Sequence, residues 1–80
     1  MKRVPVESSV LASVLYRPKL RLLEVEFRSG EFYRYFDVPR RSYNELLNAE
    51  SCGRYFNLNI RNRFNCKHIH SPLRVGRAGA

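Results

Sequence analysis

The residues best suited to chemistry lie between Ser51 and His70. Cys66, His68 and His70 alternate along the chain, and alternate side chains of an extended segment point the same way. Together with Cys52 they supply the sulfur and imidazole ligands that zinc accepts. Their spacing, however, matches neither a zinc finger nor a zinc ribbon. We therefore expect no metal and no cofactor, with Cys66, His68 and His70 as the ligand candidates should a metal bind.

The sequence offers no recognisable catalytic arrangement. No serine or cysteine stands at a spacing from a base that is typical of an activated nucleophile. The carboxylates either alternate along a predicted strand or lie on predicted exposed helix faces, and the glycines form no phosphate-binding loop. Cys52 belongs to the apolar stripe of a predicted helix. We expect a protein that is not an enzyme and has no small-molecule substrate.

A second set of residues suits the binding of an anion. Arg54, Asn57 and Arg61 are separated by three and four positions, which places them on one side of a helix. Arginine and asparagine hydrogen-bond phosphate groups or base edges, and Tyr55 beside them could stack on a base. The predicted nucleic-acid-binding residues are Arg54, Tyr55, Asn57, Arg61, Arg63 and Lys67.

The distribution of charge supports a binding surface. The net charge is +8, and all seven acids precede residue 51. The last thirty residues contain no acid and six bases, which are Arg54, Arg61, Arg63, Lys67, Arg74 and Arg77. The alternative is that the helix arginines are solvated or pair with Glu45 and Glu50, and that Tyr55 packs in the core. Two carboxylates cannot neutralise six bases, so the charge favours a polyanionic partner or an acidic protein.

Length and composition exclude several classes of protein. Eighty residues allow one domain, and an apolar fraction of 44% is too high for a disordered chain. No apolar run approaches the roughly 18 residues of a membrane span, and the N-terminus lacks the apolar stretch of a secretory signal. Two cysteines are too few for a disulfide framework. We expect a cytoplasmic protein that does not associate with membranes.

An antiparallel sheet is expected to precede these residues. A strand is predicted from about Leu11 to the turn at Pro18, although the apolar spacing there also fits a short helix. Residues 20–28 alternate between apolar and charged side chains, which is typical of a half-buried strand. Residues 31–36 then form the return strand after a turn. The prediction is a three-stranded meander.

The register of this hairpin follows from its side chains. A three-residue loop with Gly30 in the left-handed conformation pairs Glu24 with Arg34 and Val25 with Tyr33. Opposite charges then lie on one face and apolar partners on the other, which a two-residue loop does not achieve.

The same register assigns the aromatic residues of the hairpin to opposite faces. Tyr33 and Tyr35 are expected to be inward or half-inward residues that pack toward the core. Phe32, Arg34 and Phe36 form an exposed aromatic and basic patch on the other face, which is a candidate for base stacking or for a protein partner.

Two short helices complete the expected α+β fold and pack on one face of the sheet. The first covers residues 40–49 after Pro39, with one apolar stripe. The second starts at the capping residue Ser51 and runs to about Phe64. Its core stripe consists of Cys52, Phe56, Ile60 and Phe64. We expect a polar leader over 1–7, a single domain over 8–65 and a mobile basic tail over 66–80.

These motifs, taken in order, resemble a known family. They are Ser8-Ser9-x-Leu11-x-x-Val14-x-Tyr16, Leu23-Glu24-Val25-Glu26-Phe27-x-x-Gly30, Tyr33-x-Tyr35-x-x-Val38-Pro39, Tyr43-x-x-Leu46 and Ser51-x-Gly53-x-Tyr55-Phe56-Asn57-x-x-Ile60-Arg61. The pattern resembles the KTSC domain, a short bacterial and phage module named after the C-terminus of some lysyl-tRNA synthetases. The resemblance covers about residues 6–64. Leu15 stands where the family usually has glycine, and the ending from Phe64 to His68 also departs from the family pattern.

The resemblance implies a family without an assigned function, and the attachment to a synthetase suggests RNA. The leading hypothesis is a non-enzymatic nucleic-acid-binding module, with RNA as the ligand of the second helix. The alternative is a protein-interaction module, a small phage or bacterial regulator that docks on an acidic partner surface.

Overall fold

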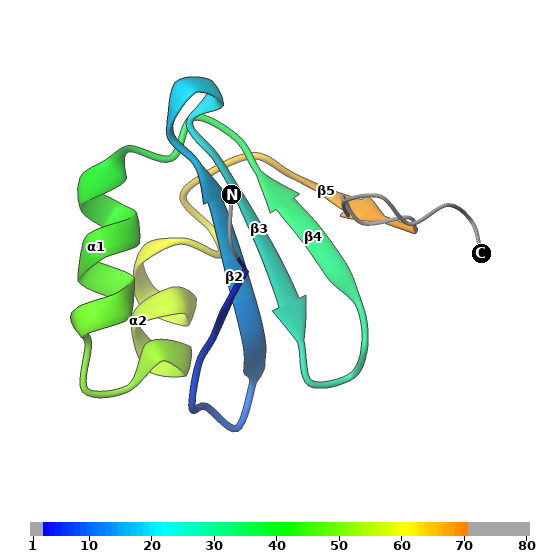
Figure 1. The fold of residues 1–80 in the computed structure, drawn as a ribbon, viewed down its shortest axis with the longest axis vertical. Coiled ribbons are helices and arrows are strands. Elements are labelled where there is room, and N and C mark those ends of the chain that lie inside the picture. The colour runs from blue at the N-terminus through cyan, green and yellow to red at the C-terminus, as the bar shows by residue number, and fades with distance from the viewer. Residues whose placement is uncertain (1–2, 71–80) are drawn as a thin grey trace.

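A computed structural model of the chain describes residues 3–70. It is an α+β fold in which two helices cover one face of a five-stranded antiparallel sheet of order β1-β2-β3-β4-β5 (Figure 1). The elements are β1 (Val4–Pro5), β2 (Leu11–Arg17), a 3-10 turn (Pro18–Leu20), β3 (Leu22–Phe27), β4 (Phe32–Tyr35), α1 (Arg40–Asn48), α2 (Cys52–Asn59) and β5 (Cys66–Ile69). No helix within this range is long and apolar enough to span a membrane.

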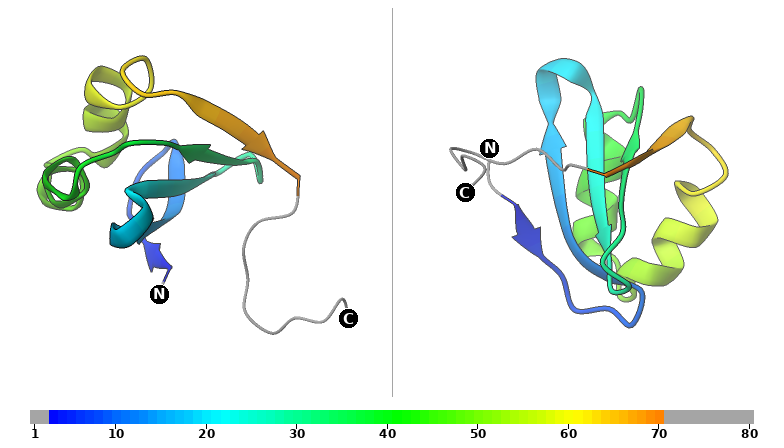
Figure 2. Two further views of the ribbon diagram at one scale, coloured as in Figure 1. Left: turned by 90° about the horizontal axis from the view of Figure 1, so that it is seen from above. Right: turned by 90° about the vertical axis from the view of Figure 1, so that its right-hand side faces the viewer.

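The prediction of an α+β fold with an antiparallel sheet and two helices is confirmed, but the prediction of three strands is wrong. Two further strands lie at the edges of the sheet, β1 inside the predicted leader and β5 inside the predicted tail (Figure 2). Val4 pairs with Val14, and His68 pairs with Tyr33. Both edge strands are held by backbone pairing and show little alternation of apolar side chains. The side-chain pattern therefore did not predict them. The rest of the predicted tail, 71–80, lies outside the described residues.

The hairpin formed by β3 and β4 has the predicted register. Glu24 lies opposite Arg34, and Val25 lies opposite Tyr33. The loop contains three residues and ends at Gly30, whose φ of +97° is a conformation that favours glycine. The prediction of the three-residue loop is therefore confirmed.

The core lies between the helices and the helix-facing side of the sheet. Phe56 of α2, Ile60 directly after it and Leu46 of α1 are fully buried against β2, β3 and β4. Tyr16 is also buried, and its hydroxyl donates a hydrogen bond of 2.6 Å to the Val38 carbonyl. This bond ties β2 to the segment that enters α1.

The second helix is shorter than predicted. Ser51 caps it as expected, because the Ser51 hydroxyl accepts a hydrogen bond of 3.2 Å from the Arg54 N–H. The helix ends at Asn59, and Ile60 leaves the helical conformation with φ −121° and ψ −47°. Asn59 disfavours the helix because an asparagine side chain hydrogen-bonds the nearby backbone in non-helical conformations. The chain must also turn here to reach β5. Phe64 nevertheless packs against the core, as its place in the stripe predicts.

Gly53 permits a close approach between α2 and the segment that leads into β2. A β-carbon at this position would lie 2.9 Å from the Ser8 hydroxyl oxygen and 3.5 Å from Val10. That hydroxyl accepts hydrogen bonds from the N–H groups of Val10 and Leu11, at 3.0 and 3.1 Å, which hold it in place. The contact leaves no room for a larger residue.

We expect Gly53→Ala to destabilise the domain by about 1–3 kcal/mol, the usual cost of overpacking. This cost is expected to outweigh the gain of up to about 1 kcal/mol in helix propensity that replacing glycine by alanine brings. Urea unfolding measures the difference, and Asn57→Ala on the exposed side of the same helix is the control. A variant as stable as the wild type would contradict the close contact.

Candidate nucleic-acid interface

The outer side of α2 and the turn that follows it carry three of the six predicted nucleic-acid-binding residues. Arg54, Asn57 and Arg61 are all exposed, and the Arg61 Nη1 donates a hydrogen bond of 3.3 Å to the Asn57 Oδ1. We call these three residues the α2 basic face. Within the described part of the chain, the ion pairs are Arg3–Glu24, Arg34–Glu24 and Arg41–Glu45. The two arginines of the α2 basic face therefore have no carboxylate partner among residues 3–70.

Sequence reasoning missed one member of this surface. Leu58 is 67% exposed and stands four positions after Arg54 and three before Arg61, so it lies among the residues of the α2 basic face. Its place outside the stripe of Cys52, Phe56 and Ile60 was the available signal. The surface is thus cationic with an apolar side chain on it.

Tyr55 and Arg63 belong to a different surface. The Tyr55 hydroxyl donates a hydrogen bond of 2.5 Å to a carboxylate oxygen of Glu45 in α1. Burial, followed by the hydrogen bond to Glu45 and the charge of that carboxylate, raises the pKa of Tyr55 to about 12, so the hydroxyl stays protonated. Arg63 lines the same groove between α1 and the end of α2. The structure does not bring these two residues together with the α2 basic face.

Lys67 lies on the sheet face that the helices leave uncovered. It stands opposite Arg34 across β4 and β5, and Arg34 reaches over this face to Glu24. Strand alternation therefore separates Lys67 from Arg54 and Arg61.

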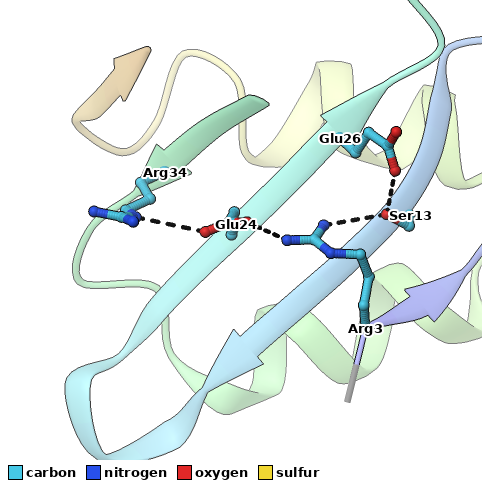
Figure 3. Close-up of polar contacts among 5 residues, drawn as sticks. All are labelled: Arg3, Ser13, Glu24, Glu26 and Arg34. Atoms are coloured by element: carbon cyan, nitrogen blue, oxygen red, sulfur yellow. Dashed lines mark hydrogen bonds and ion pairs between the residues drawn. The ribbon is translucent and has the colours of Figure 1, made fainter. Parts of the chain in front are cut away.

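The same uncovered face contains a network around a buried acid (Figure 3). Glu24 has an exposed fraction of 0% and lies between Arg3 and Arg34, whose side chains are each 26% exposed. The Arg34 Nε is 3.5 Å from one Glu24 oxygen, and Arg3 pairs with the other. Arg3 also donates to the Ser13 hydroxyl at 3.1 Å, and that hydroxyl donates to Glu26 at 2.7 Å. Two arginines are thus committed to one buried carboxylate.

This network corrects the predicted exposed patch of Phe32, Arg34 and Phe36. Arg34 is half-buried and engaged by Glu24, and the Arg3 guanidinium carbon lies 5.1 Å above the centre of the Phe32 ring. Phe36 is 36% exposed, as predicted, whereas Phe32 and Arg34 are half-buried. The prediction failed because residue 3 was assigned to a leader, whereas β1 places Arg3 over this face.

The predicted metal-ligand candidates lie along β5 and just beyond it. The His68 ring stacks on Tyr33, with centroids 4.9 Å apart, and the His70 ring lies 4.7 Å from His68. Cys66 lies opposite Tyr35 across β4 and β5. Burial, and after it the neighbouring Cys66, raises the pKa of Tyr35 well above its ordinary value. Cys52 donates to the Leu46 carbonyl at 3.3 Å and so faces α1. Among residues 3–70 no three His, Cys, Asp or Glu side chains are grouped to hold a metal ion.

A pocket of about 450 Å³ opens beside the α2 basic face, where Arg61 meets the loop between β3 and β4. We call it the hairpin pocket. Phe27, Arg28 and Tyr33 line it together with Arg61. Tyr33 is half-buried and packs against the core, which agrees with the predicted inward or half-inward position. The pocket depends on how α2 packs beside the hairpin, which local sequence patterns do not encode.

An antiparallel sheet with two helices on one face and a cationic helix surface defines the protein as a small α+β domain. The chain belongs to the KTSC domain family, because residues 7–64 match that family. A KTSC domain protein from Yersinia pestis has a similar structure, with a TM-score of 0.82 and 40% identity over 85% of this chain and 96% of that one.

Two relatives show the contexts in which similar sequences occur. An uncharacterised protein of Stutzerimonas stutzeri is 53% identical over 57 residues, which are 71% of this chain and 80% of that protein. A lysine–tRNA ligase of Nostoc punctiforme is 38% identical over 63 residues, which are 79% of this chain and 11% of the ligase.

Proposed function

We propose that this domain binds RNA, without catalysis, through the α2 basic face. The observation that carries the proposal is the exposed pair of Arg54 in α2 and Arg61 just after its end, neither of them neutralised by a carboxylate within residues 3–70. Arginine presents a planar fork of donors that suits phosphate oxygens. Asn57 between them adds an amide that can contact phosphate, sugar or a base edge.

A relative supports RNA as the ligand class. The lysine–tRNA ligase that contains a similar segment is, by its name, an enzyme that acts on tRNA. This support is an association and adds to the charge argument, which stands on the chain itself.

Salt dependence tests the proposal. We expect the logarithm of the association constant for single-stranded RNA to fall linearly with the logarithm of salt concentration. The slope is about −0.7 per neutralised phosphate, so two arginines alone give about −1.4. Fluorescence anisotropy with a labelled single strand measures it, with heparin as a competitor that controls for charge alone. A flat salt dependence, or no RNA binding at low salt, would contradict the proposal.

A second candidate function has its own observation in Leu58. An exposed leucine among cationic residues gains free energy against an apolar partner and little against phosphate. An acidic protein with an apolar contact would use Arg54, Leu58 and Arg61 together. Leu58→Ser separates the two functions, because it weakens a protein complex and leaves RNA affinity unchanged. Capture of one stoichiometric partner that survives nuclease treatment would favour this candidate.

A further inference from the structure

We propose that the hairpin pocket binds one nucleotide of a single RNA strand, with its phosphate between Arg28 and Arg61 and its base against Phe27 and Tyr33. The inference rests on the proposed function and extends it from a phosphate-binding surface to a site that recognises a base. The hairpin pocket has a volume of about 450 Å³, within the range of about 300–1,000 Å³ that is usual for small-molecule sites.

The two arginines of the pocket come from different parts of the fold. Arg28 lies in the loop of the β3–β4 hairpin, and Arg61 follows the end of α2. The Arg28 Nε donates a hydrogen bond of 2.8 Å to the Ser8 carbonyl, which orients the guanidinium and leaves its terminal NH₂ groups available. Within the described residues neither arginine forms an ion pair. One acid, Glu31, also lines the pocket, so two positive charges face one negative charge and an anion is favoured.

The apolar part of the pocket is aromatic. Phe27 and Tyr33 meet edge to face, with centroids 5.5 Å apart and planes at 86°. Both rings line the pocket and are half-buried, so part of each ring is open to a planar base in the pocket. Stacking on such rings is tolerant of base identity because every base has a π-face.

The aromatic row continues beyond the pocket to the edge of the sheet. Tyr33 stacks on His68 of β5 with planes at 26°, and His70 follows His68. His68 and His70 are exposed. An RNA strand that leaves the pocket toward β5 would meet His68 and His70 as further stacking surfaces. In the opposite direction it would run along α2 to Asn57 and Arg54. The site therefore lies where a base-binding row and a phosphate-binding helix meet.

The test compares two probes, a short single-stranded oligoadenylate and the same ribose-phosphate strand without bases. We expect the wild type to bind oligoadenylate more tightly than the abasic strand. Tyr33→Leu should weaken oligoadenylate binding by about five- to 150-fold, the loss expected for one stacked base, and leave the abasic strand unaffected. Arg28→Gln should weaken both probes and reduce the salt slope by about 0.7.

Arg40→Gln is the matched control for the arginine variant. Arg40 is exposed at the start of α1, near the opposite end of the sheet from the hairpin loop, so it removes the same charge away from the pocket. Circular dichroism and thermal unfolding show whether each variant is folded. If Tyr33→Leu does not fold, Arg28→Gln still decides, because Arg28 is exposed and its backbone pairing is unchanged.

The outcomes separate this inference from the proposed function. Equal affinity for both probes, together with Arg28→Gln and Arg40→Gln variants that bind alike, would overturn the pocket and leave the α2 basic face as the RNA surface. Absence of binding to either probe by the wild type would overturn both. Amide chemical-shift changes around Arg28 and Tyr33 with oligoadenylate, but not with the abasic strand, would support the pocket.

Discussion

Replacing Arg54 and Arg61 together by glutamate should abolish RNA binding and leave the domain folded. Both side chains are exposed, and neither pairs with a carboxylate within residues 3–70, so their loss removes no buried interaction. Two charge-assisted contacts to phosphate are lost, each contributing about 1.5–3 kcal/mol, and repulsion is added in their place. The expected loss of affinity is at least about 100-fold. Anisotropy at one fixed salt concentration measures it.

The control for this double variant must change the total charge by the same amount. Lys19→Glu with Arg40→Glu does so, because both residues are exposed and lie toward the opposite end of the sheet from the hairpin loop. Both double variants lower the net charge from +8 to +4, since each substitution removes one positive and adds one negative charge. If the control loses as much affinity as the test variant, total charge governs binding and the α2 basic face does not.

The second large effect concerns stability. Glu24→Gln should lower the free energy of unfolding by about 2–4 kcal/mol. Glu24 is fully buried between Arg3 and Arg34, and the amide no longer neutralises two guanidinium groups that cannot both return to water. Breaking a buried pair usually costs about 3–5 kcal/mol, and the partial exposure of the arginines reduces that cost. In a domain of this size the melting temperature should fall by roughly 10–25 °C.

Glu26→Gln is the matched control for Glu24. Glu26 lies on the same strand and the same sheet face, is partly exposed, and accepts a hydrogen bond of 2.7 Å from the Ser13 hydroxyl, which an amide oxygen can also accept. Its substitution should change the free energy of unfolding by less than about 1 kcal/mol. Equal effects at the two positions, measured by urea unfolding, would show that the arginines relax into solvent and that Glu24 is not their required counter-charge.

The elements that could be predicted are those that local patterns specify. The hairpin register followed from the alternation of Leu23 to Phe27 and from Gly30, because cross-strand partners this near in sequence are set by the loop. The capping residue Ser51, the buried Phe56 of α2 and the buried Ile60 at its C-terminal end followed from helical spacing. In each case the deciding interaction joins residues within one element or across one turn.

The elements that could not be predicted depend on pairing between distant segments. Arg3 reaches Glu24, and His68 stacks on Tyr33, across separations that no local pattern reports. The edge strands add backbone hydrogen bonds, which are nearly independent of side-chain identity. The hairpin pocket has the same origin, since Arg61 and Arg28 line one pocket only when the chain at the end of α2 packs beside the hairpin.

The sequence by itself determined that the excess positive charge lies after residue 50 and that Arg54 and Asn57 share one helix side. Arg61 lies beyond the end of α2 and stays beside them through its hydrogen bond to Asn57. The tertiary structure decided that the other predicted binding residues do not join them. Tyr55 and Arg63 turn toward α1, and Lys67 lies on the uncovered sheet face. The reason is geometric: helical periodicity holds along one element, whereas the end of α2 at Asn59 and the alternation of β5 reset the direction of every side chain that follows.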